Sequence, residues 1–388
     1  MPGQRKYLTG PGGQTDGHHG NAVLFTSGSG NTDGAYSDNS GGIMRILALF
    51  LCILWCAVPA SALEIEAPEV PEKARNWMPQ NTSSLFEGLC EQFDVVVDSI
   101  YGDVREASGV CVGIIAAALM VSLLETASSD VKRVSQMAGV VSISALLLLN
   151  TNSLIRLASD TVIEIGEYGK LLLPVMTTAL AAQGGISTSA ALYAGTAMFT
   201  SILQSAIGNL LVPGVYLFLA LSVGNGATGE NILKNTSDVL KGFLTWSLKI
   251  LLMIFTTYLG LTGVISGTTD AAALKAAKVT MSSFVPVVGG VLSDASDAVL
   301  VSAGLVKNAA GIYGILAVLA LFLRPFLRIG LHYLVLKLTG MICSVFSENR
   351  ISALIQAFSS ALALLLGMTA AECVMVLIST VCFMRGTG

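Results

Sequence analysis

The chain has 388 residues, of which 53% are hydrophobic and only 12% are charged, and its mean hydropathy is +0.72. Soluble proteins carry about 25% charged residues, so this chain has too few charges to cover a water-exposed surface of its size. The formal net charge of −4 excludes a basic nucleic-acid-binding surface, and three histidines argue against a histidine-based metal enzyme. Composition therefore predicts an all-α, polytopic integral membrane bundle, since helices satisfy their own backbone groups in lipid.

The first segment, residues 1–43, differs from the rest of the chain. Eleven of its residues are Gly, and Ser, Asn and Asp make up much of the remainder. A segment of this composition buries too little apolar surface to offset its chain entropy, so we expect it to be disordered.

The next segment, 44–62, has the three parts of a secretory signal peptide. A short basic start precedes an apolar stretch at 46–58, and the small residues Ala60 and Ala62 form a cleavage site. Because such a signal acts at an N-terminus, we expect translation to start at Met44. The alternative is an uncleaved first transmembrane helix, although the apolar stretch is shorter than the about 20 residues that a span needs.

Residues 63–108 form an acidic leader, with ten Asp or Glu against three Lys or Arg. Apolar residues recur at helical spacing over 82–100, which predicts an amphipathic helix. The signal peptide places this leader outside the cytoplasm. Its acidity argues against binding to anionic lipid, so a protein partner or the rest of this chain is the expected contact.

Residues 109–388 are predicted to form a multi-span membrane domain of about six to nine spans. Polar residues at 151–170 separate two of its apolar runs. The basic residues between runs fit cytoplasmic turns under the positive-inside rule. The three expected turns contain Lys132 with Arg133, Lys234 with Lys241, and Arg324 with Arg328. The apolar runs lie at 109–124, 134–149, 171–182, 190–207, 210–223, 243–265, 311–323, 329–346, 351–367 and 368–384.

One stretch of this domain, residues 264–308, has a broken amphipathic pattern. Residues 270–281 predict one amphipathic helix, Pro286 and the following glycines interrupt the pattern, and 291–306 resume helical spacing. This order favours a re-entrant or pore-side element, with a surface amphipathic pair as the alternative. The candidate functional residues of the stretch are Gly267, Asp270, Lys275, Lys278, Pro286, Gly289, Gly290 and Asp294.

Catalytic and motor motifs are missing from the sequence. It contains no G-x-x-x-x-G-K-[ST], no H-E-x-x-H and no G-x-S-x-G, so we expect neither an ATPase nor another enzyme, and no cofactor. Glu372 lies between two apolar runs, where it is either a turn residue or a buried ionisable group with a function. Two G-x-x-x-G spacings indicate close helix packing, with a homo-oligomer as an alternative. They are Gly109 with Gly113 and Gly263 with Gly267.

Several of these features together resemble the stage III sporulation protein AE family, over roughly residues 44–388. The resemblance is carried by the signal peptide, by L-K-A-A-K at 274–278, by S-S-F-V-P-V-V-G-G at 282–290, and by P-F-L-R-I-G at 325–330. It implies a multi-pass protein of endospore-forming Firmicutes, in the mother-cell membrane that engulfs the forespore.

The resemblance also implies partners. Family members belong to an eight-protein set, AA to AH, thought to form a channel or feeding tube with the forespore protein Q. In that set AA is the ATPase and AG and AH form rings, so this chain would be an export-gate-like component without its own motor. The alternative function is a stand-alone permease or ion-coupled transporter, which usually shows an internal repeat with paired broken helices.

Overall fold

The computed structural model describes residues 70–79, 85–127, 132–229, 231–284, 289–346 and 349–386. Within these ranges all regular secondary structure is helical, which confirms the predicted all-α class. The expected disorder of 1–43, the signal peptide 44–62 with its cleavage site, and Pro286 lie outside the described residues.

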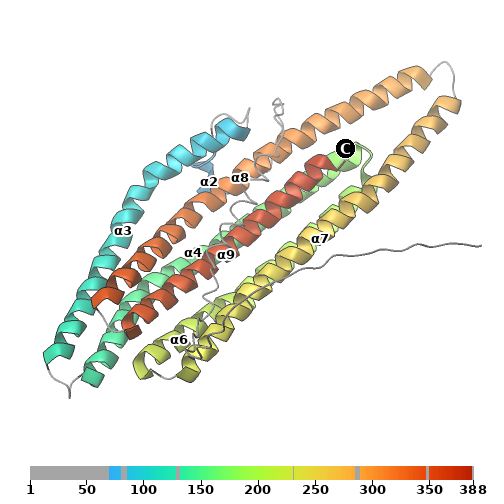
Figure 1. Cartoon of the computed structure of the whole chain (residues 1–388). Helices are drawn as coiled ribbons and strands as arrows, with labels where there is room; N and C mark the ends of the chain where they lie inside the picture. Colours follow the sequence, from blue (N-terminus) through green and yellow to red (C-terminus); the bar gives the residue numbers. More distant parts are fainter. Residues whose placement is uncertain are drawn as a thin grey trace, which may run out of the picture. The chain divides into compact units, whose positions relative to one another are not determined.

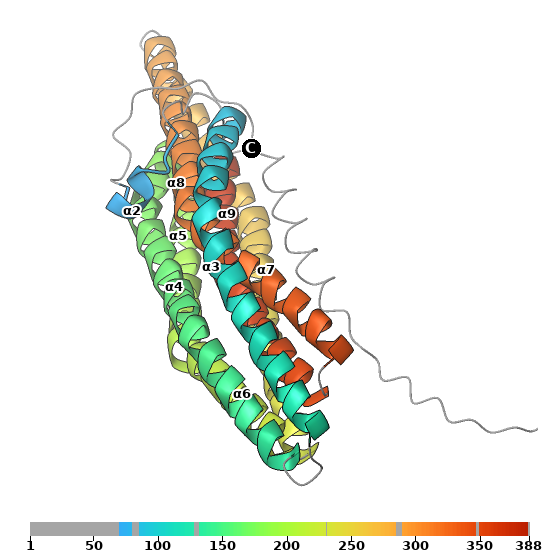
Figure 2. The same ribbon diagram turned by 90° about the vertical axis from the view of Figure 1, so that its left-hand side faces the viewer.

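The helices follow one another with short connections (Figures 1 and 2). In chain order they are α2 (Glu72–Arg75), α3 (Leu85–Ala127), α4 (Lys132–Ala182), α5 (Ile186–Ala206), the π-helical turn η1 (Ile207–Leu211), α6 (Val212–Thr228), α7 (Asn231–Phe284), α8 (Gly289–Phe346) and α9 (Asn349–Arg385).

Six helical segments of the described chain are long and apolar enough to cross a membrane, in agreement with the predicted six to nine spans. They run over Ile100–Leu123, Val134–Ala182, Ile186–Thr228, Ile232–Thr262, Leu300–Val345 and Arg350–Arg385. Several helices exceed a bilayer by a wide margin. At about 1.5 Å per residue the 58 residues of α8 extend about 87 Å, whereas the hydrocarbon layer is about 30 Å thick.

Several of the predicted boundaries are wrong, because apolar runs that were expected to be separate belong to continuous helices, and Lys241 lies within α7 rather than in a cytoplasmic turn. Residues 151–170 continue α4 without a turn, and 351–367 joins 368–384 in α9. Arg324 and Arg328 lie within α8 rather than in a cytoplasmic turn. Polar side chains do not interrupt these helices where they bond back to the helix or across to a neighbour, as Thr161 does to the carbonyl of Leu157.

Arg328 shows why a cationic side chain is stable inside α8. Its guanidinium lies 2.8 Å from a carboxylate oxygen of Glu106 and 3.4 Å from one of Asp103, both on α3. One turn earlier on α8, Arg324 stacks over the ring of Trp77 at 4.9 Å. These contacts join the acidic leader to the membrane domain, so the leader makes one of its two expected contacts, that with the rest of the chain.

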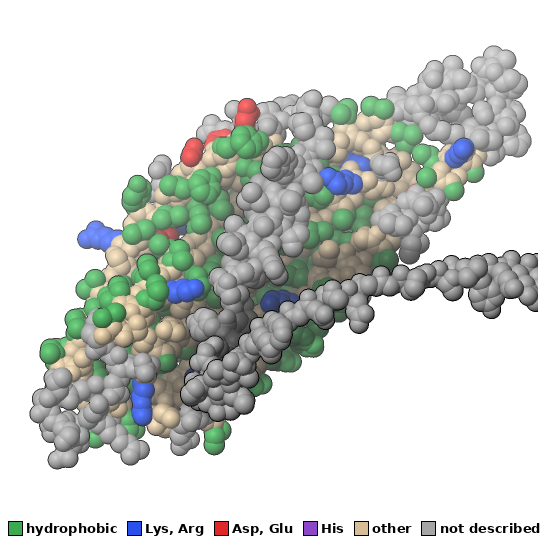
Figure 3. All heavy atoms as spheres, viewed as in Figure 1, with side chains coloured by type: hydrophobic (Ala, Val, Ile, Leu, Met, Phe, Trp, Pro, Cys, Tyr) green, Lys and Arg blue, Asp and Glu red, His purple; other side chains and the backbone are tan. Residues whose placement is uncertain are grey.

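The helix α9 forms the centre of the bundle. In the most apolar stretch of α9, 83% of the residues are buried. In the corresponding stretch of α7 only 17% are buried, so α7 presents most of its apolar residues to the surroundings. The principal packing partner of α9 is α8, which runs beside it, and α4, α5, α6 and α7 also contact it (Figures 1 and 2). Hydrophobic side chains cover much of the face seen in Figure 3, as a lipid-facing surface requires. Those exposed on α7 include Phe243, Trp246, Met253 and Ile254.

The helices approach one another closely where glycine faces a large side chain. At Gly195 on α5 the missing Cβ makes room for the ring of Tyr258 on α7. The hydroxyl of Tyr258 then donates a hydrogen bond to the carbonyl of Ala191 at 3.0 Å. This contact joins α5 to α7.

We expect Gly195→Ala to destabilise the protein, because its methyl group overlaps the Tyr258 ring and forces α5 away from α7. Overpacking of this kind costs about 1–3 kcal/mol. The midpoint of thermal unfolding of the detergent-purified protein measures this loss of stability. The control is Gly260→Ala on α7, where a Cβ meets nothing within 4 Å. Equal midpoints for the two variants would contradict the proposed close contact.

Candidate functional site

The most unusual side chain of the bundle is Glu372, in the middle of α9. Its exposed fraction is 0%, and neither carboxylate oxygen has a hydrogen-bond partner among the described residues. The structure therefore excludes the interpretation of Glu372 as a turn residue and retains the alternative, a buried ionisable group. A buried acid within a membrane span is costly and marks a functional position by default.

Glu372 faces α4 and α5, where a glycine leaves room for it. A Cβ added to Gly166 of α4 would lie 2.6 Å from Oε1 of Glu372 and would overlap the amide nitrogen of Gln204 on α5. The amide nitrogen of Gln204 is itself buried and has no partner, while its oxygen accepts a hydrogen bond of 2.9 Å from Lys170 Nζ. Lys170 is exposed, Gln204 half-buried and Glu372 fully buried, so this polar cluster leads from the bundle surface to its core.

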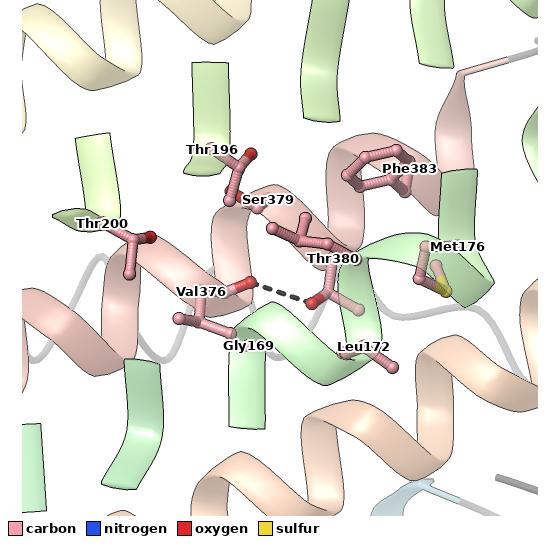
Figure 4. A pocket seen from close by; sticks show the side chains of 10 residues that line it. Gly169, Leu172, Met176, Thr196, Thr200, Val376, Ser379, Thr380 and Phe383 are labelled. Atoms are coloured by element: carbon pink, nitrogen blue, oxygen red, sulfur yellow. Dashed lines mark hydrogen bonds between the residues drawn. The ribbon is translucent and has the colours of Figure 1, made fainter. Parts of the chain in front are cut away.

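A small cavity continues the same three-helix interface by one turn (Figure 4). On each of the three helices, one residue that lines the cavity lies about one turn from a residue of the polar cluster. These are Gly169 after Gly166 on α4, Thr200 before Gln204 on α5, and Val376 after Glu372 on α9. Four hydroxyl side chains line the cavity among apolar residues. They are Thr196, Thr200, Ser379 and Thr380.

The hydroxyls of the cavity hold α5 against α9. Thr196 and Ser379 share a hydrogen bond of 2.9 Å across the interface, and Thr200 Oγ1 lies 3.9 Å from the sulfur of Met375. Thr380 instead donates to the carbonyl of Val376 in its own helix at 2.8 Å (Figure 4). The cavity has a volume of about 10 Å³ and mostly apolar walls, so it has room for about one water molecule and is too small for a large substrate.

Among the eight candidate residues of 264–308, the structure gives the clearest role to Asp270 on α7. Its two carboxylate oxygens accept hydrogen bonds from the backbone amides of Ser187 at 3.0 Å and Thr188 at 2.8 Å. Those amides belong to the first turn of α5, whose own N-cap, Gly185, supplies no side-chain bond. Asp270 therefore caps α5 from another helix.

The turn before α5 is packed on the same part of α7. Gly184 has φ of +92°, a conformation that favours glycine, and a Cβ there would lie 2.8 Å from Leu274. Burial alone would raise the pKa of Asp270, but its hydrogen bonds with Thr188 and Ser187 outweigh burial and lower it. Asp270 thus has a structural role that fixes the α4–α5 turn.

The remaining candidates of the described residues are divided between α7 and α8. Gly267, Lys275 and Lys278 lie in the last part of α7, and Gly289, Gly290 and Asp294 lie in the first part of α8. The amphipathic segments predicted on either side of the break are therefore the ends of two long helices. Lys275 is exposed, while the side chains of Lys278 and Asp294 are not among those that the structure describes.

Sequence reasoning missed Gln204, Lys170 and Gly166. The available signal was the spacing of Gly166, Gly169 and Lys170 on one helix, but their partners on α5 and α9 are distant in sequence. No group of three or more His, Cys, Asp or Glu side chains that could hold a metal occurs among the described residues.

The fold and this buried cluster define a multi-pass helical membrane protein with a polar centre. The family model of stage III sporulation protein AE matches residues 84–387, and the chain belongs to that family. A curated relative, stage III sporulation protein AE of Bacillus subtilis strain 168, is 24% identical over 214 residues. This alignment covers 54% of the chain and 53% of the relative, so the match spans about half the length of each. No solved structure matches the chain.

We expect Asp270→Asn to weaken the anchoring of α5, because an amide has one oxygen for two backbone donors. We expect the free energy of unfolding to fall by about 1–2 kcal/mol, which is in the range for loss of a helix cap with a charged acceptor. Thermal unfolding in detergent near pH 7 measures it, and Asp238→Asn, at an exposed position of α7, is the control.

The same pair of variants tests pH dependence. The pKa of Asp270 is lower in the folded protein than in the unfolded chain. The contribution of its carboxylate to the free energy of unfolding is therefore fully present above the ordinary carboxyl range, and it is lost as the pH falls through the lowered pKa. The difference in midpoint between the wild type and Asp270→Asn should therefore shrink between about pH 7 and about pH 3. A difference that grows on acidification would contradict the cap.

Proposed function

We propose that the protein is a membrane-embedded component of a channel complex between mother cell and forespore, and that sporulation requires it. The observation that carries this proposal is the family match over 84–387 on a chain with six candidate spans. The family is a sporulation family, and the described helices make a multi-pass membrane protein. The channel itself goes beyond both observations.

The proposed role within the complex is export-gate-like. A gate needs many packed helices and few charges, and it can take its energy from a separate motor. The chain has 12% charged residues and no nucleotide-binding loop. We therefore propose that it is not itself an enzyme and depends on an ATPase in another subunit.

The partners follow from the family and are proposals for this chain. Other stage III sporulation proteins are expected to associate with it, specifically the ATPase AA, the ring-forming AG and AH, and protein Q of the forespore membrane. The acidic leader contacts α8 through Asp103 and Glu106, and much of its outer face is exposed, including Phe86 and Tyr101. We propose this exposed face of α3 and the 264–308 segment as the surfaces for partners.

A stand-alone ion-coupled transporter is the second candidate, and one observation favours it. Buried ionisable side chains within spans commonly belong to ion pathways, and Glu372 is such a side chain. The two candidates differ in when and where the protein acts. A channel component acts only during sporulation, whereas a transporter also serves growing cells.

The first test is imaging of a tagged copy, expressed from its own promoter through a sporulation time course. Under the channel proposal the signal surrounds the engulfing forespore in the mother cell, and deletion of the gene reduces heat-resistant spores by orders of magnitude. Uniform membrane signal in growing cells, together with normal spore yield after deletion, would favour the transporter instead.

A second prediction concerns the connection between α7 and α8. We expect replacement of Pro286 with Leu, and of Gly289 and Gly290 with Ala, to abolish sporulation while the protein stays in the membrane. The reason is that a longer uninterrupted helix would change the surface offered to partners. Membrane fractionation and spore counts measure the two effects. Lys234→Gln, at an exposed position of α7 outside residues 264–308, serves as the control. Normal spore yield from the triple variant would remove this segment from the proposed partner surface.

A further inference from the structure

We infer that Glu372 is a proton-binding site in the core of the bundle, covered by Gln204 and Lys170 and exchanging its proton through the hydroxyl-lined cavity beside it. This inference goes beyond the proposed function and does not depend on it. It rests on the position of the carboxyl, on two buried polar groups without partners, and on the cavity one turn away.

The first step is the cost of a charge at this position. An ionised carboxylate without hydrogen bonds in an apolar interior is strongly unfavourable. Glu372 is fully buried, and both oxygens lack partners. The carboxyl must therefore carry a proton in this arrangement, or a positive group must approach it.

The second step is the choice of a proton over a metal cation. The side-chain oxygen of Gln204, a neutral oxygen of the same cluster, already accepts a hydrogen bond from the ammonium group of Lys170. Lys170 places a positive charge close enough to interact with Glu372, and this charge opposes the entry of another cation. A proton needs only one carboxyl oxygen and no coordination shell, so it fits the groups that are present.

The third step is the response of the cluster to loss of the proton. When the carboxyl O–H bond breaks, the proton passes to a water molecule that reaches Glu372 from the adjoining cavity, and the bonding electrons stay on Glu372. The carboxyl itself does not line that cavity, whose nearest wall on α9 is Val376. The resulting carboxylate can accept a hydrogen bond from the unpartnered amide nitrogen of Gln204, and Lys170 balances its charge. Gln204 thus changes partners with the protonation of Glu372, on the helix that also carries Thr196 and Thr200.

Several other titratable groups lie on α9 or on the helices packed against it. Cys373 follows Glu372 and is buried, while α5 and α6 contain no Lys, Arg, Asp or Glu. On α4, Tyr168 is buried and its hydroxyl has no hydrogen-bond partner among the described residues, while Glu167 is exposed. Three basic groups of α7 and α8 bind other residues: Lys241 donates to Ser360, Arg324 stacks on Trp77, and Arg328 pairs with Asp103 and Glu106.

The test is infrared difference spectroscopy of the full-length protein in lipid nanodiscs. We expect an absorption of a protonated carboxyl that is lost in Glu372→Gln and kept in Glu167→Gln, the exposed acid on α4. In D2O the band should shift, because the cavity allows exchange, and raising the pH should remove it reversibly. Circular dichroism confirms that each variant is folded.

The inference is overturned if Glu372→Gln leaves the carboxyl absorption unchanged, or if the band stays unshifted in D2O. Should Glu372→Gln fail to fold, Glu372→Asp keeps a carboxyl and must move the band instead of deleting it. These outcomes concern the site alone. A protein that passes the spectroscopic test but localises uniformly in growing cells would keep the proton site and lose the proposed channel function.

Discussion

The burial of α9 is the constraint on which the rest of the structure depends. A helix that packs on α4, α5, α6, α7 and α8 must present small or apolar residues in every direction. Three glycines of the neighbouring helices lie where a Cβ would meet a side chain of α9. Gly166 and Gly169 of α4 face Glu372 and Val376, and Gly311 of α8 faces Met384. Glu372 differs from the other residues of α9 because it is an acidic side chain at a fully buried position where the helices are closely packed.

The general architecture could be predicted from the sequence, because low charge and long apolar runs leave few alternatives to a helical membrane bundle. The helix boundaries were harder to predict. Polar residues at 151–170 and the arginines at 324 and 328 interrupt the hydropathy pattern without interrupting the helices. Several of them have partners within the same helix or elsewhere in the fold, as Thr161, Arg324 and Arg328 do. Hydropathy along one chain contains no information about such partners, for example Asp103 and Glu106 for Arg328.

The candidate site was only partly predictable for the same reason. Glu372 could be singled out as an acid among apolar residues, but its burial depends on α4 and α5. Asp270 was selected within the broken segment, and the structure gives it a different role, as the cap of a helix that begins 84 residues earlier. Local pattern thus identified unusual residues, whereas their roles required the fold.

The π-helical turn η1 joins α5 and α6 into one continuous helix and determines which side of α6 faces α9. Pro213 lacks an N–H, and the wider turn immediately before it accommodates this missing donor. A π turn holds one residue more than an α turn and so rotates everything after it by about 100° about the helix axis. That rotation sets the azimuth of α6 relative to Thr196, Thr200 and Gln204. A chain one residue shorter at 207–211 would keep the polar face of α5 in place and turn a different side of α6 toward α9.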